Sequence, residues 1–230
     1  MKINNSLIIG YGEIGKALSN VLNGSDILDK HIDTEYSLDD AYDIIHICFP
    51  YSDKFIREVK AYQKKYKAKY TVIHSTVPVG TSKKCNAVHS PVIGIHPNLE
   101  SGIKTFIKYL GGKDAHRVAN YFRKSGLRVY LYDKSETTEL MKILSTTKLG
   151  MDSEYTKEVK RLCDKYKIPF EAWTLWTQNY NEGYQKLGYP EYARPNLIPI
   201  MGKLGGHCVL PNCDLLKSKF TDLVKQCQNI

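Results

Sequence analysis

Several features are missing from this 230-residue sequence, and each absence narrows the class of protein. No apolar run approaches the roughly 20 residues of a membrane-spanning helix, and Met1 and Lys2 lead into strand-like Leu7-Ile8-Ile9 rather than into a secretory segment. The six cysteines lack the dense, regular spacing of a disulfide framework, so reduced thiols are expected. These absences favour a cytoplasmic, globular protein without a membrane segment.

Charge and ligand spacing argue against two further classes. The formal net charge is +9, but the lysines are spread along the chain without an arginine-rich block, so nucleic-acid binding is not expected. Attraction of phosphate-bearing cofactors is a sufficient use for this charge. His207, Cys208 and Cys213 have no second closely spaced pair of ligands, and no metal site is predicted. Core packing, rather than metal binding, is the interpretation of His46, His74 and His96.

Strand-like apolar runs alternate with helical stretches through the first 132 residues. Several runs are continuously apolar, which is typical of strands that are covered by helices on both faces of a sheet. The alternation predicts an α/β fold, with residues 1–132 forming a Rossmann-type, doubly wound, mainly parallel sheet. The expected strands are residues 7–9, 26–29, 44–49, 70–74, 92–96 and 128–132.

A smaller all-helical domain is predicted for residues 133–230. Asp133 and Glu136 have the spacing of a capping box and open a long amphipathic pattern, which predicts a central helix to residue 166 and a hinge between the domains. Residues 171–200 are rich in aromatic residues and broken by glycine and proline, so short helices and loops are expected there. A last helix is predicted over residues 214–227.

A glycine-rich segment follows the first predicted strand and runs into a helix. Its first glycine permits a tight turn, its second lets backbone approach a pyrophosphate, and its third lets helix pack on strand. Asp29 follows Gly10 by 19 residues, at the end of the second predicted strand, where a carboxylate would bind ribose hydroxyls. This favours NAD over NADP, although Lys30 could neutralise a 2′-phosphate. A glycine turn that binds no dinucleotide is the alternative. The segment is Gly10-Tyr11-Gly12-Glu13-Ile14-Gly15.

Near the end of the chain, Gly205-Gly206-His207-Cys208 precedes the last predicted helix. A helix N-terminus can lower the pKa of a thiol, and paired glycines let a substrate approach closely, so Cys208 is a candidate nucleophile. A free cysteine also packs commonly as a small, inert apolar side chain. The residues alone leave both interpretations open.

Four segments, taken in order, resemble the nucleotide-sugar dehydrogenases, such as the UDP-glucose, GDP-mannose and UDP-N-acetylmannosamine dehydrogenases. They are Gly10 to Gly15, Ser75-Thr76-Val77-Pro78-Val79-Gly80-Thr81, Glu139-Leu140-Met141-Lys142, and Gly205-Gly206-His207-Cys208. The second and fourth segments are specific to that family, whereas the other two are common motifs. The resemblance covers nearly the whole chain.

The resemblance implies an NAD-dependent oxidation of a sugar-type primary alcohol, in which Cys208 forms a thiohemiacetal and then a thioester that water hydrolyses. By this resemblance, Lys142 matches the lysine that stabilises the oxyanion, Thr76 matches the threonine that orders water, and Glu100 falls near the position of the family's glutamate. It also implies a homodimer built on the central helix. The expected cofactor contacts are Gly10, Tyr11, Gly12, Glu13, Ile14, Gly15, Asp29, Lys30, Pro50, Ser75 and Thr76.

The sequence departs from this family at two catalytic positions. Thr146 stands where the family usually has asparagine, and Asn212 stands where it has an aspartate. Asn212 cannot act as a base, and Asp214 replaces it only if the loop is re-registered, so the hydrolytic half of the reaction is the part in question. Because 22 residues follow Cys208, the family's carboxy-terminal nucleotide-binding domain is not expected in this sequence.

These departures keep two other functions open. One is a non-catalytic, dinucleotide-binding sensor or assembly subunit. The other is a small hydroxyacid dehydrogenase that uses Lys142 and does not need Cys208. For either enzyme the expected substrate is a small molecule, and for the leading hypothesis a nucleotide sugar is one candidate.

Overall fold

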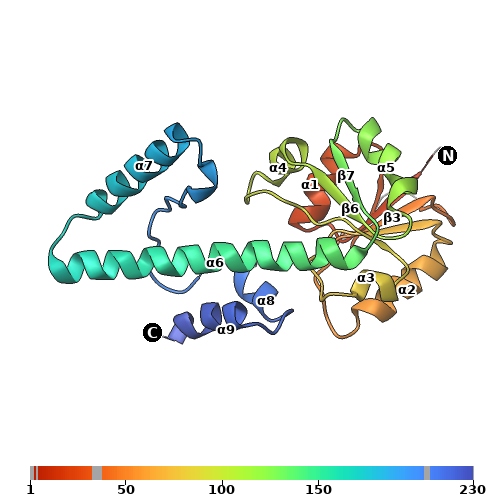
Figure 1. The fold of residues 1–230 in the computed structure, drawn as a ribbon. Coiled ribbons are helices and arrows are strands. Elements are labelled where there is room, and N and C mark those ends of the chain that lie inside the picture. The colour runs from red at the N-terminus through yellow and green to blue at the C-terminus, as the bar shows by residue number, and fades with distance from the viewer. Residues whose placement is uncertain (1–2, 4, 33–37, 205–207, 230) are drawn as a thin grey trace. The chain divides into compact units, whose positions relative to one another are not determined.

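The computed structural model describes residue 3 and residues 5–32, 38–204 and 208–229 (Figure 1). The chain divides into two compact units, Met1–Lys142 and Ile143–Ile230. The boundary between them falls inside the long helix α6 (Ser135–Tyr166), whereas the sequence pattern places it before that helix, after residue 132.

The first unit contains a seven-stranded sheet in the order β2-β1-β3-β4-β5-β6-β7. All neighbouring strands are parallel except β5 and β6. The chain moves from β1 outward to β2 and then crosses to β3 on the other side of β1, so the strand order reverses between β1 and β3. The strands are β1 (Ser6–Ile9), β2 (Asp26–Leu28), β3 (Ile44–Ile47), β4 (Tyr70–Ile73), β5 (Val88–His89), β6 (Lys108–Gly111) and β7 (Val129–Tyr132).

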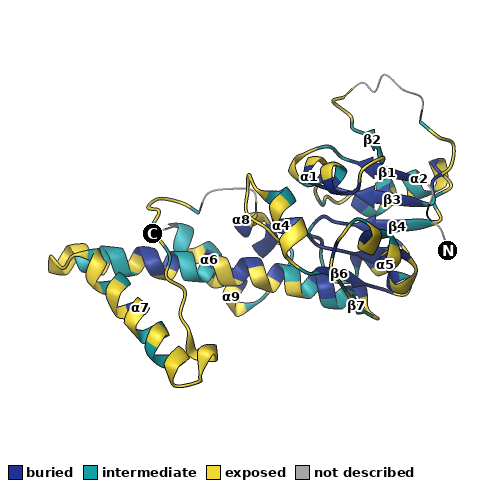
Figure 2. Ribbon diagram, turned by 90° about the horizontal axis from the view of Figure 1, so that it is seen from above, coloured by how far each residue is buried: buried dark blue, intermediate teal, exposed yellow. Residues whose placement is uncertain are grey.

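Helices cover both faces of this sheet (Figure 2). The strand side chains alternate between two apolar cores. Ile8 and Ile44 point to one face, whereas Leu7 and Ile45 point to the other. All four side chains are fully buried, which explains the continuously apolar strand sequences. The predicted doubly wound fold is therefore confirmed. The helices of this unit before α6 are α1 (Glu13–Val21), α2 (Phe55–Lys65), α3 (Thr81–Lys84), α4 (Leu99–Thr105) and α5 (Ala115–Lys124).

The strand predicted over residues 92–96 is wrong. Strand β5 ends at His89, and the amide of Ser90 makes the last bond to the sheet, to the carbonyl of Ile73. Pro91 has no N–H to continue the ladder, and Ile95 is 74% exposed. Beyond β5 the sheet continues instead with β6, which the sequence pattern did not predict and which pairs antiparallel with β5 and parallel with the edge strand β7.

In the second unit the described residues are helical. Besides the rest of α6, the unit contains α7 (Phe170–Lys186), the 3₁₀ turn η1 (Pro190–Tyr192), α8 (Val209–Cys213), α9 (Lys219–Gln226) and the 3₁₀ turn η2 (Cys227–Asn229). Helix α6 has 32 residues and ends at Tyr166, as predicted. Among the described residues, no helix has the length and apolar character that a membrane crossing needs.

Two local predictions in the second unit are wrong. The first half of the 171–200 region is one helix of 17 residues, because Gly183 continues α7 rather than ending it. The helix predicted over residues 214–227 begins later than predicted: α8 ends at Cys213, and α9 starts at Lys219, after a capping box in which the Ser218 side chain accepts the amide of Thr221. Helices α8 and α9 can approach α6 closely because residue 150 is glycine: an added Cβ there would lie 2.6 Å from Val209.

Candidate functional site

The glycine loop lies between β1 and α1, at the point where the strand order reverses. Gly10 has a φ of +95°, and an added Cβ would lie 2.9 Å from the amide nitrogen of Phe49. At Gly15 an added Cβ would lie 2.0 Å from the carbonyl oxygen of Gly10. At Gly12, the N-cap of α1, nothing lies within 4 Å. The outer glycines thus permit close packing, whereas Gly12 leaves open space at a helix N-terminus, where a pyrophosphate fits.

The carboxylate of Asp29 joins the end of β2 to this loop. It accepts the backbone amide of Tyr11 at 2.6 Å and that of His31 at 2.9 Å. These bonds, chiefly the one from Tyr11, hold the pKa of Asp29 below its ordinary value, so the side chain is ionised. A carboxylate has about four acceptor positions, so Asp29 retains capacity for ribose hydroxyl groups.

A cavity of about 420 Å³ lies at the carboxyl ends of β1, β2 and β3. In open α/β sheets, ligands bind outside the carboxyl ends of the strands where the strand order reverses. Four of the predicted cofactor residues line this cavity: Gly10, Asp29, Lys30 and Pro50. The other lining residues are Ile9, Leu28, His31, Phe49, Ser52, Glu58 and Tyr62.

Sequence reasoning missed Glu58 and Tyr62, which come from α2. Their spacing of four residues places them on one face of a helix, but nothing in the sequence says that this face borders the cofactor rather than solvent. Glu58 Oε1 lies 3.6 Å from Lys30 Nζ, so the lysine that follows Asp29 in the sequence forms an ion pair with Glu58.

The segment after β4 is held by hydrogen bonds from two directions. Ser75 Oγ donates to the carbonyl of Phe49 at 2.6 Å and so joins the end of β4 to the end of β3. Glu139, in the first part of α6, is fully buried and accepts the amides of Gly80 at 2.6 Å and Ser82 at 2.7 Å. Thr76 lies within this segment and is partly exposed. Glu139 belongs to one of the four segments that resemble the family, but the sequence does not predict that its carboxylate anchors the segment after β4.

Two lysines hold the segment that follows β5. Lys142 Nζ donates to the carbonyl of Val92 at 2.8 Å, and Lys108 Nζ donates to the carbonyls of Ser90 at 2.9 Å and Pro91 at 3.3 Å. Lys108 is 3% exposed, and burial lowers its pKa from 10.5 to about 7. Nothing in the sequence indicates that this lysine is buried, because lysine side chains are usually at the surface.

His46 and His74 are buried in the core, as predicted. His74 Nδ1 lies 2.8 Å from the carbonyl of Ser90, and His74 Nε2 lies 3.0 Å from His46 Nδ1. Nδ1 of His74 therefore carries the proton, and His46 donates to His74. Burial lowers the pKa of His46 to about 3 and also lowers that of His74, so both are neutral.

The prediction that His96 is a core residue is wrong. Its side chain is 59% exposed, and its Nε2 lies 3.2 Å from Oε1 of Glu13, the first residue of α1. The pair lies at the end of α1 that adjoins the glycine loop.

Glu100 contacts the opposite end of α1. It accepts the side-chain amide of Asn20 at 2.9 Å and the ammonium of Lys104 at 2.6 Å, and the bond from Lys104 is the main cause of its lowered pKa. Asn20 lies about two helical turns beyond Gly12. The structure therefore joins Glu100 to α1 but does not bring it to the glycine loop.

In the second unit, the two residues at which the sequence departs from the resemblance contact each other. Asn212 Nδ2 donates to Thr146 Oγ1 at 3.3 Å, and Thr146 Oγ1 donates to the carbonyl of Ile143 at 2.9 Å. Both side chains are 7% exposed. This position therefore holds an amide and a hydroxyl group, neither of which serves as a base near neutral pH.

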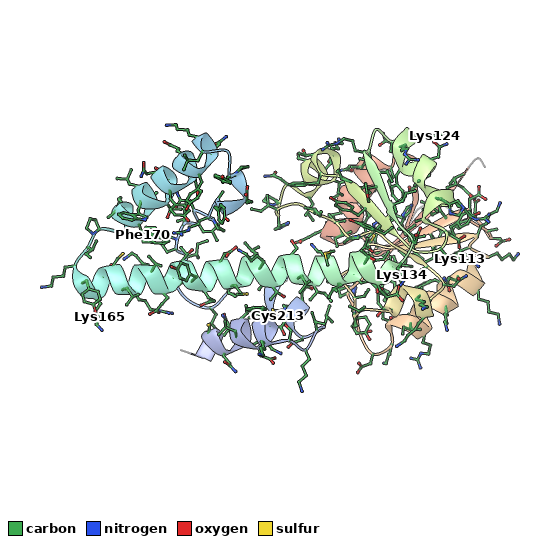
Figure 3. The ribbon with its side chains drawn as sticks, in the orientation of Figure 1. Lys113, Lys124, Lys134, Lys165, Phe170 and Cys213 are labelled. Atoms are coloured by element: carbon green, nitrogen blue, oxygen red, sulfur yellow. The ribbon has the colours of Figure 1, made fainter. Side chains whose placement is uncertain are left out.

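Cys208 is exposed and is the N-cap of α8, whereas Gly205, Gly206 and His207 lie outside the described residues. Cys213 differs from Cys208: it is buried on the side of α8 that faces α6, and burial raises the pKa of its thiol (Figure 3). Within the described parts of the chain, no group of three or more histidine, cysteine or acidic side chains could hold a metal ion.

No model of a protein family and no curated protein matches this chain by sequence. Solved structures match at low identity. UDP-D-ManNAc dehydrogenase from Pyrococcus horikoshii is 15% identical, with a TM-score of 0.73 over 98% of this chain and 68% of that chain. UDP-glucose dehydrogenase from Pyrobaculum islandicum is 14% identical, with a TM-score of 0.70 over 99% and 68%. The 3-hydroxyisobutyrate dehydrogenase of Mycobacterium tuberculosis is 11% identical, with a TM-score of 0.69 over 98% and 92%.

At these identities the likeness shows the fold. The chain has the architecture of the Rossmann-type dehydrogenases, in which a doubly wound sheet is followed by a helical region. It spans about two thirds of the length of the nucleotide-sugar dehydrogenases and nearly all of the hydroxyisobutyrate dehydrogenase.

Proposed function

We propose that the protein is an NAD-dependent dehydrogenase that oxidises an alcohol. The observation that carries the proposal is the geometry of the glycine loop, where Gly10 and Gly15 are required by packing and Gly12 is left open at the start of α1. The ionised Asp29 and the cavity beside it fit the adenosine half of the cofactor.

When bound, NAD would supply the hydride acceptor; each NAD molecule can accept one hydride, so a two-step oxidation would consume two NAD molecules per substrate. The protein contributes binding and charge. The α1 amides hold the pyrophosphate, Asp29 accepts the ribose hydroxyls, and Lys142 stabilises the oxyanion that develops at the substrate carbon. The hydroxyl proton is released to water.

For the substrate we propose a sugar-type primary alcohol, by way of the resemblance to nucleotide-sugar dehydrogenases. The Cys208 thiolate adds to the aldehyde carbon to give a thiohemiacetal, and loss of the second hydride leaves a thioester. Water then attacks the thioester, releasing the carboxylate and returning the thiol, with Thr76 and Glu100 as the residues proposed to assist. The exposure of Cys208 supports this role. The Thr146–Asn212 pair lacks a carboxylate, so we expect thioester hydrolysis to be the slow step.

A hydroxyacid dehydrogenase is the second candidate, and one observation favours it. The chain covers 92% of the 3-hydroxyisobutyrate dehydrogenase but 68% of the nucleotide-sugar enzymes. In this case Lys142 acts on the substrate hydroxyl group and Cys208 is dispensable. One hydride is transferred for each substrate, and the missing base at Asn212 has no consequence.

The number of NADH molecules formed per substrate distinguishes these functions. We would incubate the protein with NAD and a panel of nucleotide sugars, sugar alcohols and small hydroxyacids, beside Cys208→Ala and a control, Cys163→Ala. Two NADH per substrate, lost only in Cys208→Ala, support the cysteine mechanism. One NADH per hydroxyacid, unchanged in Cys208→Ala, supports the second candidate. Binding of NAD without turnover contradicts both and favours a sensor or assembly subunit.

We also propose a cytoplasmic homodimer built on α6. All six cysteines are free thiols, which supports a reducing compartment. Large apolar side chains of α6 are exposed along its length, among them Met141 at 50%, Tyr155 at 60% and Tyr166 at 65%. Burying such side chains against a second copy is favourable. Light scattering at micromolar concentration tests the dimer, and a monomer mass contradicts it.

A further inference from the structure

We propose that Glu58, on α2, selects NAD over NADP by neutralising the lysine that stands beside the predicted ribose-binding carboxylate. The inference rests on the proposed function, because it concerns the same cofactor cavity. NADP differs from NAD by a 2′-phosphate on the adenosine ribose. The fixed charges around Asp29 therefore decide between the two dinucleotides.

Three charged side chains line the cavity together: Asp29, Lys30 and Glu58. Asp29 and Lys30 follow β2 in the sequence, whereas Glu58 comes from α2 and so reaches the cavity independently. Glu58 Oε1 lies 3.6 Å from Lys30 Nζ, and the side chains of Lys30 and Glu58 are 71% and 31% exposed. Asp29 is engaged elsewhere, by the amides of Tyr11 and His31.

The ion pair with Glu58 changes the net charge that a cofactor meets at Lys30. An unpaired lysine beside the ribose would attract a 2′-phosphate and would oppose the preference that Asp29 sets for NAD. Because Glu58 balances that lysine, Asp29, Lys30 and Glu58 together carry one negative charge, and a dianionic phosphate is repelled. Glu58 thus restores the selectivity that Lys30 would otherwise remove.

An exposed ion pair of this kind contributes little to folding, so its removal should change binding without changing the fold. A unit charge and a dianion about 6 Å apart in water interact strongly enough to alter a binding constant about tenfold. Removing the charge of Glu58 should therefore shift the ratio of the two dissociation constants about tenfold toward NADP.

The test is calorimetric titration of the full chain with NAD and with NADP. It compares the wild type with Glu58→Gln, Lys30→Gln and the double variant. The matched control is Glu136→Gln. Glu136 pairs with Lys83 at 3.5 Å, with side-chain exposures of 30% and 77%, and this pair lines a separate cavity. The control removes the same charge from a nearly identical pair outside the proposed cofactor site.

We expect the wild type to prefer NAD, Glu58→Gln to gain about tenfold for NADP relative to NAD, and the double variant to lose that gain. Glu136→Gln should keep the wild-type ratio. A ratio in Glu58→Gln that stays within twofold of the wild type overturns the inference, and so does an equal shift in Glu136→Gln. If the wild type binds neither dinucleotide, the proposed function fails and the inference fails with it, which is a different result from unchanged selectivity.

Discussion

Replacing Lys108 by methionine should remove most of the increase in stability that the first unit gains as the pH rises from about 7 to 10.5. Lys108 is 3% exposed, and burial lowers its pKa from 10.5 to about 7 in the folded protein. Above pH 7 the folded protein therefore holds this lysine neutral, whereas the unfolded chain protonates it until the pH exceeds 10.5. Because the unfolded state binds the additional proton, the contribution of Lys108 to stability rises with pH between about 7 and 10.5 and is constant outside that window.

The size of the effect follows from the two pKa values. The interval between 10.5 and about 7 corresponds to about 5 kcal/mol at about 1.36 kcal/mol per pH unit. At pH 7 nearly all of this penalty acts on the wild type. Methionine removes it but leaves the carbonyl of Pro91 without the lysine's hydrogen bond, at a cost of about 1–3 kcal/mol. Lys108→Met should therefore be about 2–4 kcal/mol more stable than the wild type near pH 7, and no more stable above pH 10.5.

Urea unfolding followed by circular dichroism, at several pH values from 6 to 11, measures this difference. Groups other than Lys108 titrate in both proteins, so their contributions cancel when the free energies of unfolding are subtracted. Lys113→Met is the control, because Lys113 (labelled in Figure 3) is an exposed lysine that follows β6 in the sequence. A difference between Lys108→Met and wild type that stays constant from pH 7 to 10.5 would refute the reasoning.

Three further predictions concern the site. Gly15→Ala should lower the free energy of unfolding, measured by urea unfolding, by about 1–3 kcal/mol or more, because the added Cβ meets backbone atoms. Gly12→Ala should leave the free energy of unfolding unchanged and weaken NAD binding, measured by calorimetric titration. Asn212→Asp supplies the missing carboxylate and should raise the steady-state rate of NADH formation after the first turnover at least about tenfold; an unchanged rate argues against slow thioester hydrolysis. Glu139→Gln should lower stability by about 1–3 kcal/mol, measured by urea unfolding, because an amide nitrogen then faces one of two backbone donors; a neutral result contradicts its anchoring role.

The sheet and the glycine loop were predictable because each has a local signature. Continuously apolar strands indicate burial on both faces, and the glycine spacing with Asp29 at the end of β2 places a phosphate site. The prediction of a strand at residues 92–96 was wrong because the backbone bonds to β4 end at Ser90. Whether an apolar segment pairs depends on the neighbouring strands of the sheet, which the segment's own sequence does not show.

The residues that sequence reasoning missed act through long-range contacts. Glu58 acquires its place from the packing of α2 against the sheet, and Glu139 from amides that lie 57 and 59 residues away. Lys108 is unexpected in a core, because its burial depends on carbonyls that only the folded chain brings together. Such contacts are set by tertiary structure, and the sequence does not display them.

The central claim is that the glycine loop binds a dinucleotide. It is tested most directly by calorimetric titration of the full chain with NAD, beside a Gly12→Val variant. Valine would fill the open space at the start of α1, where no atom lies within 4 Å of an added Cβ. We expect saturable binding of one NAD per chain in the wild type and its loss in Gly12→Val, with the urea unfolding midpoint unchanged. Absence of binding in the wild type, or equal binding in both proteins, would contradict it.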